Sequence, residues 1–201
     1  MKTKCSSMAA GVGMVLLLVS SAMAGPIAGD PNAMPAWQGT QQFYVTDGSA
    51  TLQVDVEYAV YLPGDYYVYA YQVFNDLAGN RPVSNFSVGL DPASGAANIG
   101  WDAGAGTPGG TAPSFAGFSG TPPTSSVWYF FSNTIDPPSE YSQVLLFTSP
   151  YGPRWAPATV MDSGLSNVQN LPSPMPEPAT LALLALGGIA ALIRRRRGYG
   201  G

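Results

Sequence analysis

Carboxylates are the only conventional catalytic side chains that the central part of this chain offers. The 201-residue sequence contains no histidine, and its single cysteine is Cys5, close to the N-terminus. Lysine occurs only at Lys2 and Lys4, so the centre of the chain lacks the usual general base, thiol nucleophile and Schiff-base former. Asp55 and Glu57 share one face of an expected strand, about 6.6 Å apart along the backbone. A glycoside hydrolase uses two carboxylates at such a separation.

The surroundings of this pair argue against catalysis. Residues 51–62 alternate apolar and polar side chains, so Asp55 and Glu57 fall on the polar face of a half-buried strand. A catalytic acid needs burial to raise its pKa, whereas this face is expected to be wet. We therefore predict that the protein is not an enzyme, with a glycoside hydrolase as the weakest functional alternative.

Loop oxygens are a second kind of candidate site. Asp30, Asn32, Asp91 and Asp102 lie in segments of turn composition, and extracellular β domains hold calcium with such loop carboxylates. No segment has the ligand spacing of a known calcium loop, and Asp and Asn are also common turn formers. The sequence predicts no metal site, and a structural calcium ion is the one cofactor that these loops leave open.

A stripe of tyrosines is the third candidate site. Tyr67, Tyr69 and Tyr71 project to one face of an expected strand, where exposed rings would stack on sugar. Burial in the core is the favoured alternative, because a strand inside a sandwich buries its aromatic side chains on at least one side. The opposite face is also apolar, so the pattern leaves the identity of the buried face open.

The elements that would position these residues are strands. We predict an all-β fold, an antiparallel β-sandwich of immunoglobulin-like or jelly-roll-like type over residues 41–162. Pro63-Gly64-Asp65 predicts a hairpin. Residues 91–124 are predicted to be mostly loop with room for one short strand, and residues 25–40 and 163–174 to be an N-terminal extension and a polar linker. The expected strands are 41–46, 51–62, 66–74, 86–90, 127–131, 144–148 and 159–161.

The N-terminus predicts export. Residues 1–24 have the three parts of a signal peptide: the basic Lys2 and Lys4, an apolar stretch over residues 8–19, and the small residues Ala22 and Ala24 at the cleavage site. Cleavage there removes Cys5, so the exported protein has no thiol. All 12 acidic residues lie between Asp30 and Glu177, whereas only two basic residues, Arg81 and Arg154, lie in that range. Such an acidic surface makes nucleic acid a poor partner.

The last 27 residues, 175–201, combine three features in order. The first feature is a short extended segment formed by Pro176, Glu177 and Pro178. Each proline ring fixes its own φ and biases the preceding residue away from the helical region. The apolar run over residues 179–193 follows, and as a helix it would measure only about 22 Å. A typical span needs roughly 20 residues, so this run predicts a marginal transmembrane anchor. A basic cluster then fixes the orientation by the positive-inside rule and leaves the preceding chain outside the cytoplasm. It consists of Arg194, Arg195, Arg196 and Arg197.

This tail resembles the PEP-CTERM sorting signal of exopolysaccharide-producing bacteria, which has a Pro-Glu-Pro motif, a transmembrane helix and a basic cluster. The resemblance implies recognition of Pro176, Glu177 and Pro178 by exosortase, an intramembrane cysteine transpeptidase, and transfer to the cell surface or extracellular matrix. The central region is also similar to the mature part of many small PEP-CTERM proteins, through residues 71–75, a Trp-Tyr-Phe-Phe strand at 128–131 and residues 147–149. That similarity implies a sandwich and no known activity.

These observations together define the expected function. We expect an exported protein that is held briefly in the inner membrane by its C-terminal helix, is processed by exosortase, and then serves a structural or adhesive role at the cell surface or in the biofilm matrix. The alternative is a carbohydrate-binding module for exopolysaccharide, with Tyr67, Tyr69 and Tyr71 as its stacking residues. The expected partners are exosortase, the bilayer and exopolysaccharide, and no nucleic acid.

Overall fold

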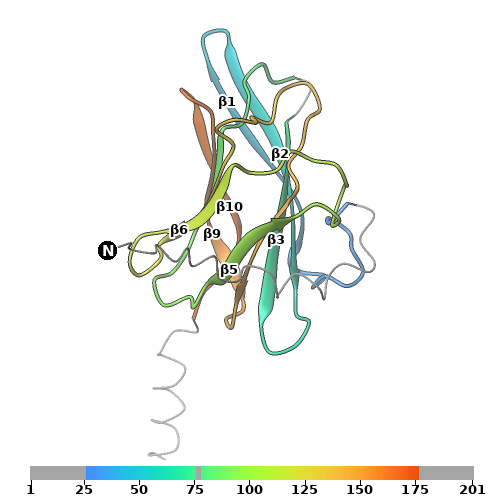
Figure 1. The fold of residues 1–201 in the computed structure, drawn as a ribbon, viewed down its shortest axis with the longest axis vertical. Helices are drawn as coiled ribbons and strands as arrows, with labels where there is room; N and C mark the ends of the chain where they lie inside the picture. The colour runs from blue at the N-terminus through green and yellow to red at the C-terminus, as the bar shows by residue number, and fades with distance from the viewer. Residues whose placement is uncertain (1–25, 76–77, 177–201) are drawn as a thin grey trace, which may run out of the picture.

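The computed structural model describes residues 26–75 and 78–176, which form strands and turns (Figure 1). The predicted signal peptide, Ala22 and Ala24 included, and the predicted helix 179–193 lie outside these residues. None of the described residues forms a helix with the length and hydrophobicity of a membrane span.

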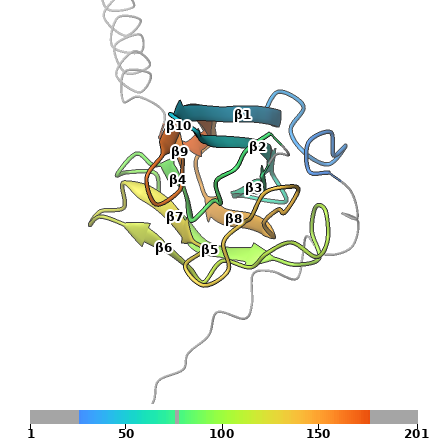
Figure 2. The same ribbon diagram turned by 90° about the horizontal axis from the view of Figure 1, so that it is seen from above.

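Ten strands of the described region form two antiparallel five-stranded sheets. Figure 2 shows the sheets as two layers, with β1 beside β10 along one side and β5 beside β6 along the other. The predicted all-β architecture of two antiparallel sheets is thus confirmed. The first sheet has the order β1 (Gln38–Asp47), β2 (Ala50–Tyr61), β3 (Tyr67–Asn75), β8 (Val144–Ser149) and β5 (Ala97–Asp102). The second has the order β10 (Ser166–Pro174), β9 (Pro153–Met161), β4 (Asn85–Gly89), β7 (Ser125–Tyr129) and β6 (Phe115–Ser119).

Two hairpins build one half of the first sheet. β1 and β2 are joined by the two-residue turn Gly48–Ser49, where Gly48 has a φ of 58°, a value that glycine adopts at little cost. β2 and β3 pair from Tyr61 with Val68 to Val54 with Asn75, which confirms the predicted hairpin.

The main core lies between the two sheets. Its aromatic centre contains Tyr69 and Phe147, stacked with ring centroids 5.1 Å apart, and Trp128 stacked on Phe86 at 5.7 Å. Aliphatic side chains from β2, β4 and β9 surround these rings. Because the interior is closed by side chains from both sheets, the face of β3 that carries Tyr69 points inward.

A second, smaller core covers the outer face of the first sheet. Ile27 and Ala33 are buried there against Val68, Ala70 and neighbours from β2 and β8. The backbone N–H of Met34 donates to the carbonyl of Val60 at 2.8 Å. The predicted N-terminal extension 25–40 therefore needs correction: residues 26–37 pack on the sheet, and β1 begins at Gln38.

The predicted loop over residues 91–124 also needs correction, because it contains β5 and β6. β5 pairs with β8 through an irregular register between Ala97 and Gly100, and it forms one edge of the first sheet. β6 pairs with β7 from Phe115 with Tyr129 to Ser119 with Ser125. Glycine and alanine weaken the strand pattern of both segments, yet edge strands need only one partner each.

The predicted linker 163–174 is wrong: residues 166–174 form β10. Its backbone pairs with β9 over the whole strand, and Leu171 lies in the main core. The hydroxyl of Tyr71 on β3 donates a hydrogen bond to the carbonyl of Pro172, which ties β10 to the opposite sheet. Pro172 and Pro174 are tolerated because β10 is an edge strand.

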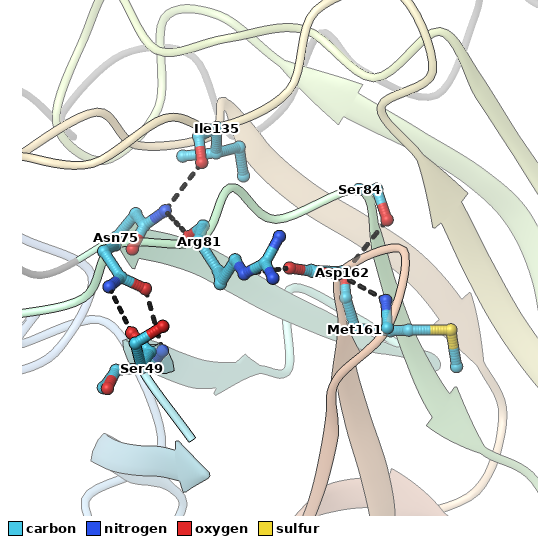
Figure 3. A network of polar contacts seen from close by, with 10 residues as sticks. Ser49, Asn75, Arg81, Ser84, Ile135, Met161 and Asp162 are labelled. Atoms are coloured by element: carbon cyan, nitrogen blue, oxygen red, sulfur yellow. Dashed lines mark hydrogen bonds and ion pairs between the residues drawn. The ribbon is translucent and has the colours of Figure 1, made fainter. Parts of the chain in front are cut away.

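A polar cluster joins the two sheets at the end that contains the β9–β10 turn (Figure 3). The side-chain amide of Asn75 donates to the carbonyls of Arg81 at 2.9 Å and Ile135 at 2.7 Å. Arg81 Nε lies 3.7 Å from Asp162 Oδ2, and this carboxylate is almost fully buried. The cluster thus fixes the connection after β3 against the turn that precedes β10.

Candidate functional site

The tyrosine stripe does not form a surface ladder. Tyr69 and Tyr71 are 0% and 1% exposed, and Tyr67 is half-buried beside the main core. Burial raises the pKa of the Tyr69 and Tyr71 phenols well above their ordinary range. The two hydroxyls donate to the carbonyls of Tyr151 and Pro172, so both polar tips are satisfied inside the protein. The expected glycan-stacking role is overturned because the rings of Tyr69 and Tyr71 have no free face.

Asp55 and Glu57 lie on the outer face of β2, near the edge of the first sheet. Glu57 is half-buried, and its Oε2 accepts a long hydrogen bond from the N–H of Ala28 at 3.4 Å. Desolvation raises the pKa of Glu57, with the charge of Asp55 as the smallest of the causes. Asp55 Oδ1 accepts from Gln42 Nε2 at 3.4 Å, across the β1–β2 ladder. These contacts hold the N-terminal segment and β1 against β2.

The candidate calcium ligands each complete a local turn. Asp30 Oδ1 accepts from the N–H and the side-chain amide of Asn32 at 2.8 and 3.0 Å. Asp91 and Asp102 accept in the same way from backbone N–H groups two residues onward, each at 2.8 Å. Within residues 26–75 and 78–176, no three His, Cys, Asp or Glu side chains gather as a metal site would require.

Three aromatic rings that sequence reasoning missed lie together on the outside of the second sheet. Tyr129 and Phe131 stack with centroids 4.7 Å apart and planes 11° from parallel, and Phe115 on β6 lies 6.1 Å from Tyr129. Phe131 is 71% exposed and Phe115 is 52% exposed. We call these three residues the aromatic platform.

Gly117 allows the Phe115 ring to lie flat along β6. A Cβ atom at Gly117 would stand 2.7 Å from Phe115 Cζ, closer than real contacts allow. A side chain at position 117 would displace the exposed Phe115 ring from its present place, which the register sets opposite Tyr129.

A polar hollow of about 410 Å³ adjoins the platform. Ser132, one of its lining residues, follows Phe131 directly, and its hydroxyl lies 3.0 Å from that of Ser114, the residue before Phe115. Thr134 donates to Asp136 Oδ1 at 2.6 Å, and Glu140 Oε2 accepts from the N–H of Asp136 at 2.9 Å. The hollow is lined by Thr111, Ala112, Ser132, Asn133, Thr134, Asp136 and Glu140. The aromatic platform and the hollow together place apolar ring faces next to fixed hydrogen-bonding groups.

The predicted sorting motif begins where the fold ends. β10 pairs through Pro174 with Pro153, and the N–H of Met175 donates to the carbonyl of Gly152 at 3.2 Å. Pro176 is the next residue and the last one described. Glu177, Pro178 and the basic cluster Arg194 to Arg197 lie outside the described residues.

Comparison with known proteins identifies this tail. Neither the curated proteins nor the solved structures give a significant match to the chain. A family model described as the PEP-CTERM protein-sorting motif matches residues 176–197, from Pro176 to the last of the four arginines. That motif implies export, membrane anchoring before processing, and processing by exosortase. The chain thus ends in a PEP-CTERM protein-sorting motif, as its resemblance predicted.

Proposed function

We propose that this protein, once sorted by exosortase, is an adhesive component of the cell surface or extracellular matrix, and that its sandwich binds polysaccharide through the aromatic platform and the adjoining hollow. The observation that carries the proposal is the stack of Phe115, Tyr129 and Phe131, with two of its rings more than half exposed. Exposed aromatic side chains gathered in one place mark interaction sites on otherwise polar surfaces.

The chemistry of the two features matches a saccharide. A sugar ring presents C–H groups on its faces, which pack on aromatic planes, and hydroxyls at its edge, which exchange hydrogen bonds with polar side chains. Tyr129 and Phe131 cover one face of each other in their stack, so the exposed Phe131 and Phe115 rings supply the apolar surface, and the hollow supplies hydroxyl, amide and carboxylate groups. An open surface of this kind suits an extended polymer rather than a small enclosed ligand.

The exposure of the carboxylates in the hollow favours polysaccharide binding without hydrolysis. Asp136 and Glu140 are the two acids of the hollow, and both are exposed. A general acid for glycoside cleavage needs a desolvated environment, which an exposed carboxylate lacks. We therefore propose a non-enzymatic, adhesive role.

Polysaccharide binding by the full chain in detergent tests the proposal. Phe115→Ala and Phe131→Ala should each weaken retention on matrix polysaccharide by about tenfold, or about 1.4 kcal/mol. Tyr44→Ala is the matched control, because Tyr44 is 53% exposed but lies on β1, away from the platform. Equal binding by the platform variants and the wild type would refute the site, and release of reducing ends would refute the non-enzymatic role.

A further inference from the structure

The C-terminal tail leaves the sandwich at one end. While the chain is anchored, this end lies close to the membrane. Strand pairing continues to Pro174, and Met175 is still hydrogen-bonded to Gly152. The apolar run starts at Ala179, four residues after Met175, and four residues reach at most about 14 Å. The headgroup layer on each side of a bilayer is about 5–8 Å thick. The folded domain therefore cannot stand far from the membrane surface.

This end of the sandwich exposes amphipathic and apolar side chains. Leu62 in the β2–β3 turn, Tyr151 in the β8–β9 turn and Trp155 on β9 are 49%, 38% and 50% exposed. Trp155 pairs with Pro172, close to the end of β10, and its ring lies 5.2 Å from that of Trp37. Figure 1 shows the β2–β3 turn, the β8–β9 turn and the end of β10 together at the lower end of the molecule. We call Leu62, Tyr151, Arg154 and Trp155 the exit face.

Arg154 gives the exit face a charge suited to anionic headgroups. The described residues contain two basic side chains, Arg81 and Arg154. Arg81 pairs with Asp162 at the other end of the sandwich, whereas Arg154 is exposed and has no ion pair among the described residues. Asp65, in the β2–β3 turn, and Asp91, in the loop that packs on the β8–β9 turn, are acidic residues of the neighbouring surface.

We propose that the exit face rests on the lipid–water interface of the membrane that holds the chain's own C-terminal anchor. Trp and Tyr side chains favour this interface because one part of each ring system is apolar and the other forms hydrogen bonds. Leu62 adds apolar area, and Arg154 meets the lipid phosphates. The anchor keeps the exit face at a high effective concentration near the lipid, so weak contacts suffice despite the acidic composition. This inference rests on the sorting motif and is independent of saccharide binding.

Docking in this way would direct the aromatic platform away from the membrane. Along β7, Ser125 pairs with Gly89, whose carbonyl accepts from the hydroxyl of Ser173 near the end of β10. Tyr129 lies at the other end of β7, about 13 Å further from the exit at about 3.3 Å per residue. The anchored protein would therefore present its platform toward the outside.

Site-specific labelling tests the proposal, since the mature part of the chain contains no cysteine. The full chain with Cys5→Ser receives a single cysteine by Leu62→Cys, Tyr151→Cys or Tyr44→Cys, each at an exposed position. An environment-sensitive fluorophore is attached, and the protein is reconstituted into vesicles of phosphatidylethanolamine and phosphatidylglycerol. Circular dichroism checks that each variant is folded.

The labels at positions 62 and 151 should show a blue shift, a several-fold rise in emission, and quenching by lipids that carry a spin label near the headgroup. The label at position 44 should show none of these, because Tyr44 lies near the opposite end of the sandwich. Adding Arg154→Gln should reduce the response at position 62 in the anionic vesicles. Labels at 62 and 151 that behave like the one at 44 would overturn the proposal. The same holds if position 62 responds only when exosortase is present, since the exit face would then be a protein contact.

Discussion

Replacing Leu171 by alanine tests whether residues 166–174 are a structural strand rather than a tether. Leu171 is fully buried in the main core, although it lies only a few residues before the sorting motif. A side chain in a linker would contribute almost nothing to folding, whereas a buried leucine contributes by removing apolar area from water. The substitution therefore separates the two interpretations by its effect on stability alone.

The expected magnitude follows from the burial of Leu171. Truncation removes three carbon atoms from a site with 0% exposure, which costs about 2.4 kcal/mol at about 0.8 kcal/mol per methylene. The cavity left between the sheets adds to this loss, so the free energy of unfolding should fall by about 3–4 kcal/mol. For a domain of this size, that corresponds to a decrease in Tm of roughly 6–16 °C.

Urea denaturation of the full chain in detergent measures this change, followed by tryptophan fluorescence, to which the buried Trp128 contributes. Val168→Ala is the matched control: Val168 lies on the same strand but is 56% exposed, so its loss should cost less than about 0.5 kcal/mol. A Leu171→Ala effect as small as that of the control would refute the assignment of β10 to the folded core.

Three further predictions concern polar groups that are buried or half-buried. Tyr71→Phe leaves the buried carbonyl of Pro172 without its donor, so the free energy of unfolding should fall by about 1–3 kcal/mol, and hydrogen exchange should speed up in β10. Desolvation raises the pKa of Glu57 above its ordinary 4.5, so the folded state holds the proton more tightly than the unfolded state. Stability should therefore decrease as the pH rises from about 4.5 through the raised pKa, and Glu57→Gln should remove this decrease in urea titrations at a series of pH values. Burial also raises the pKa of Tyr61, Tyr69 and Tyr71 above 10, so stability should fall as the pH rises past 10, and phenolate absorbance should show these three ionising only upon unfolding.

Strands with a clear apolar–polar alternation, such as β2, or with a continuous apolar run, such as β8, were predictable from the sequence, whereas β10 has neither pattern and was missed. Residues 51–62 have an apolar side chain at almost every second position, and β2 spans Ala50–Tyr61. β10 has only Val168 and Leu171 as aliphatic residues, and these fall on opposite faces because their spacing is odd. Its remaining inward positions are polar, and its prolines suggested a linker. Only pairing with β9 and contact with Tyr71 identify it as a strand.

The burial of the tyrosine stripe illustrates a different limit. Both faces of β3 are apolar, and the structure covers both: the second sheet covers Tyr69 and Tyr71, and residues 26–37 lie over the face of Val68 and Ala70. That second cover comes from a segment whose own pattern indicated only an extension. A local pattern cannot identify a covering segment that is distant in sequence.

The aromatic platform was missed because it depends on register. Phe115 comes from a segment with the composition of a loop, and Phe118, three residues later, points inward to contact Phe147. The pairing of Phe115 with Tyr129 brings the three rings together, and Gly117 lets the first of them lie flat. The sorting motif is the opposite case. It is recognised as a linear sequence, so its residue order was enough to predict it.

β10 is the last strand among the described residues and leads directly into the sorting motif, so we expect processing of the tail to depend on the stability of this strand. A true linker would let an enzyme approach the motif without touching the domain, whereas here Pro176 follows a backbone that is still bonded to Gly152. An enzyme acting at residues 176–178 must therefore work against the exit face or open the last pairs of β10 and β9. Opening them would begin at Pro174, which has no N–H to donate. The hydrogen bond from the buried Ser173 to Gly89, the buried Leu171 and the Tyr71 hydrogen bond oppose its spread. Because these contacts lie within the last four residues of β10, we expect the sandwich to stay folded while the tail is processed.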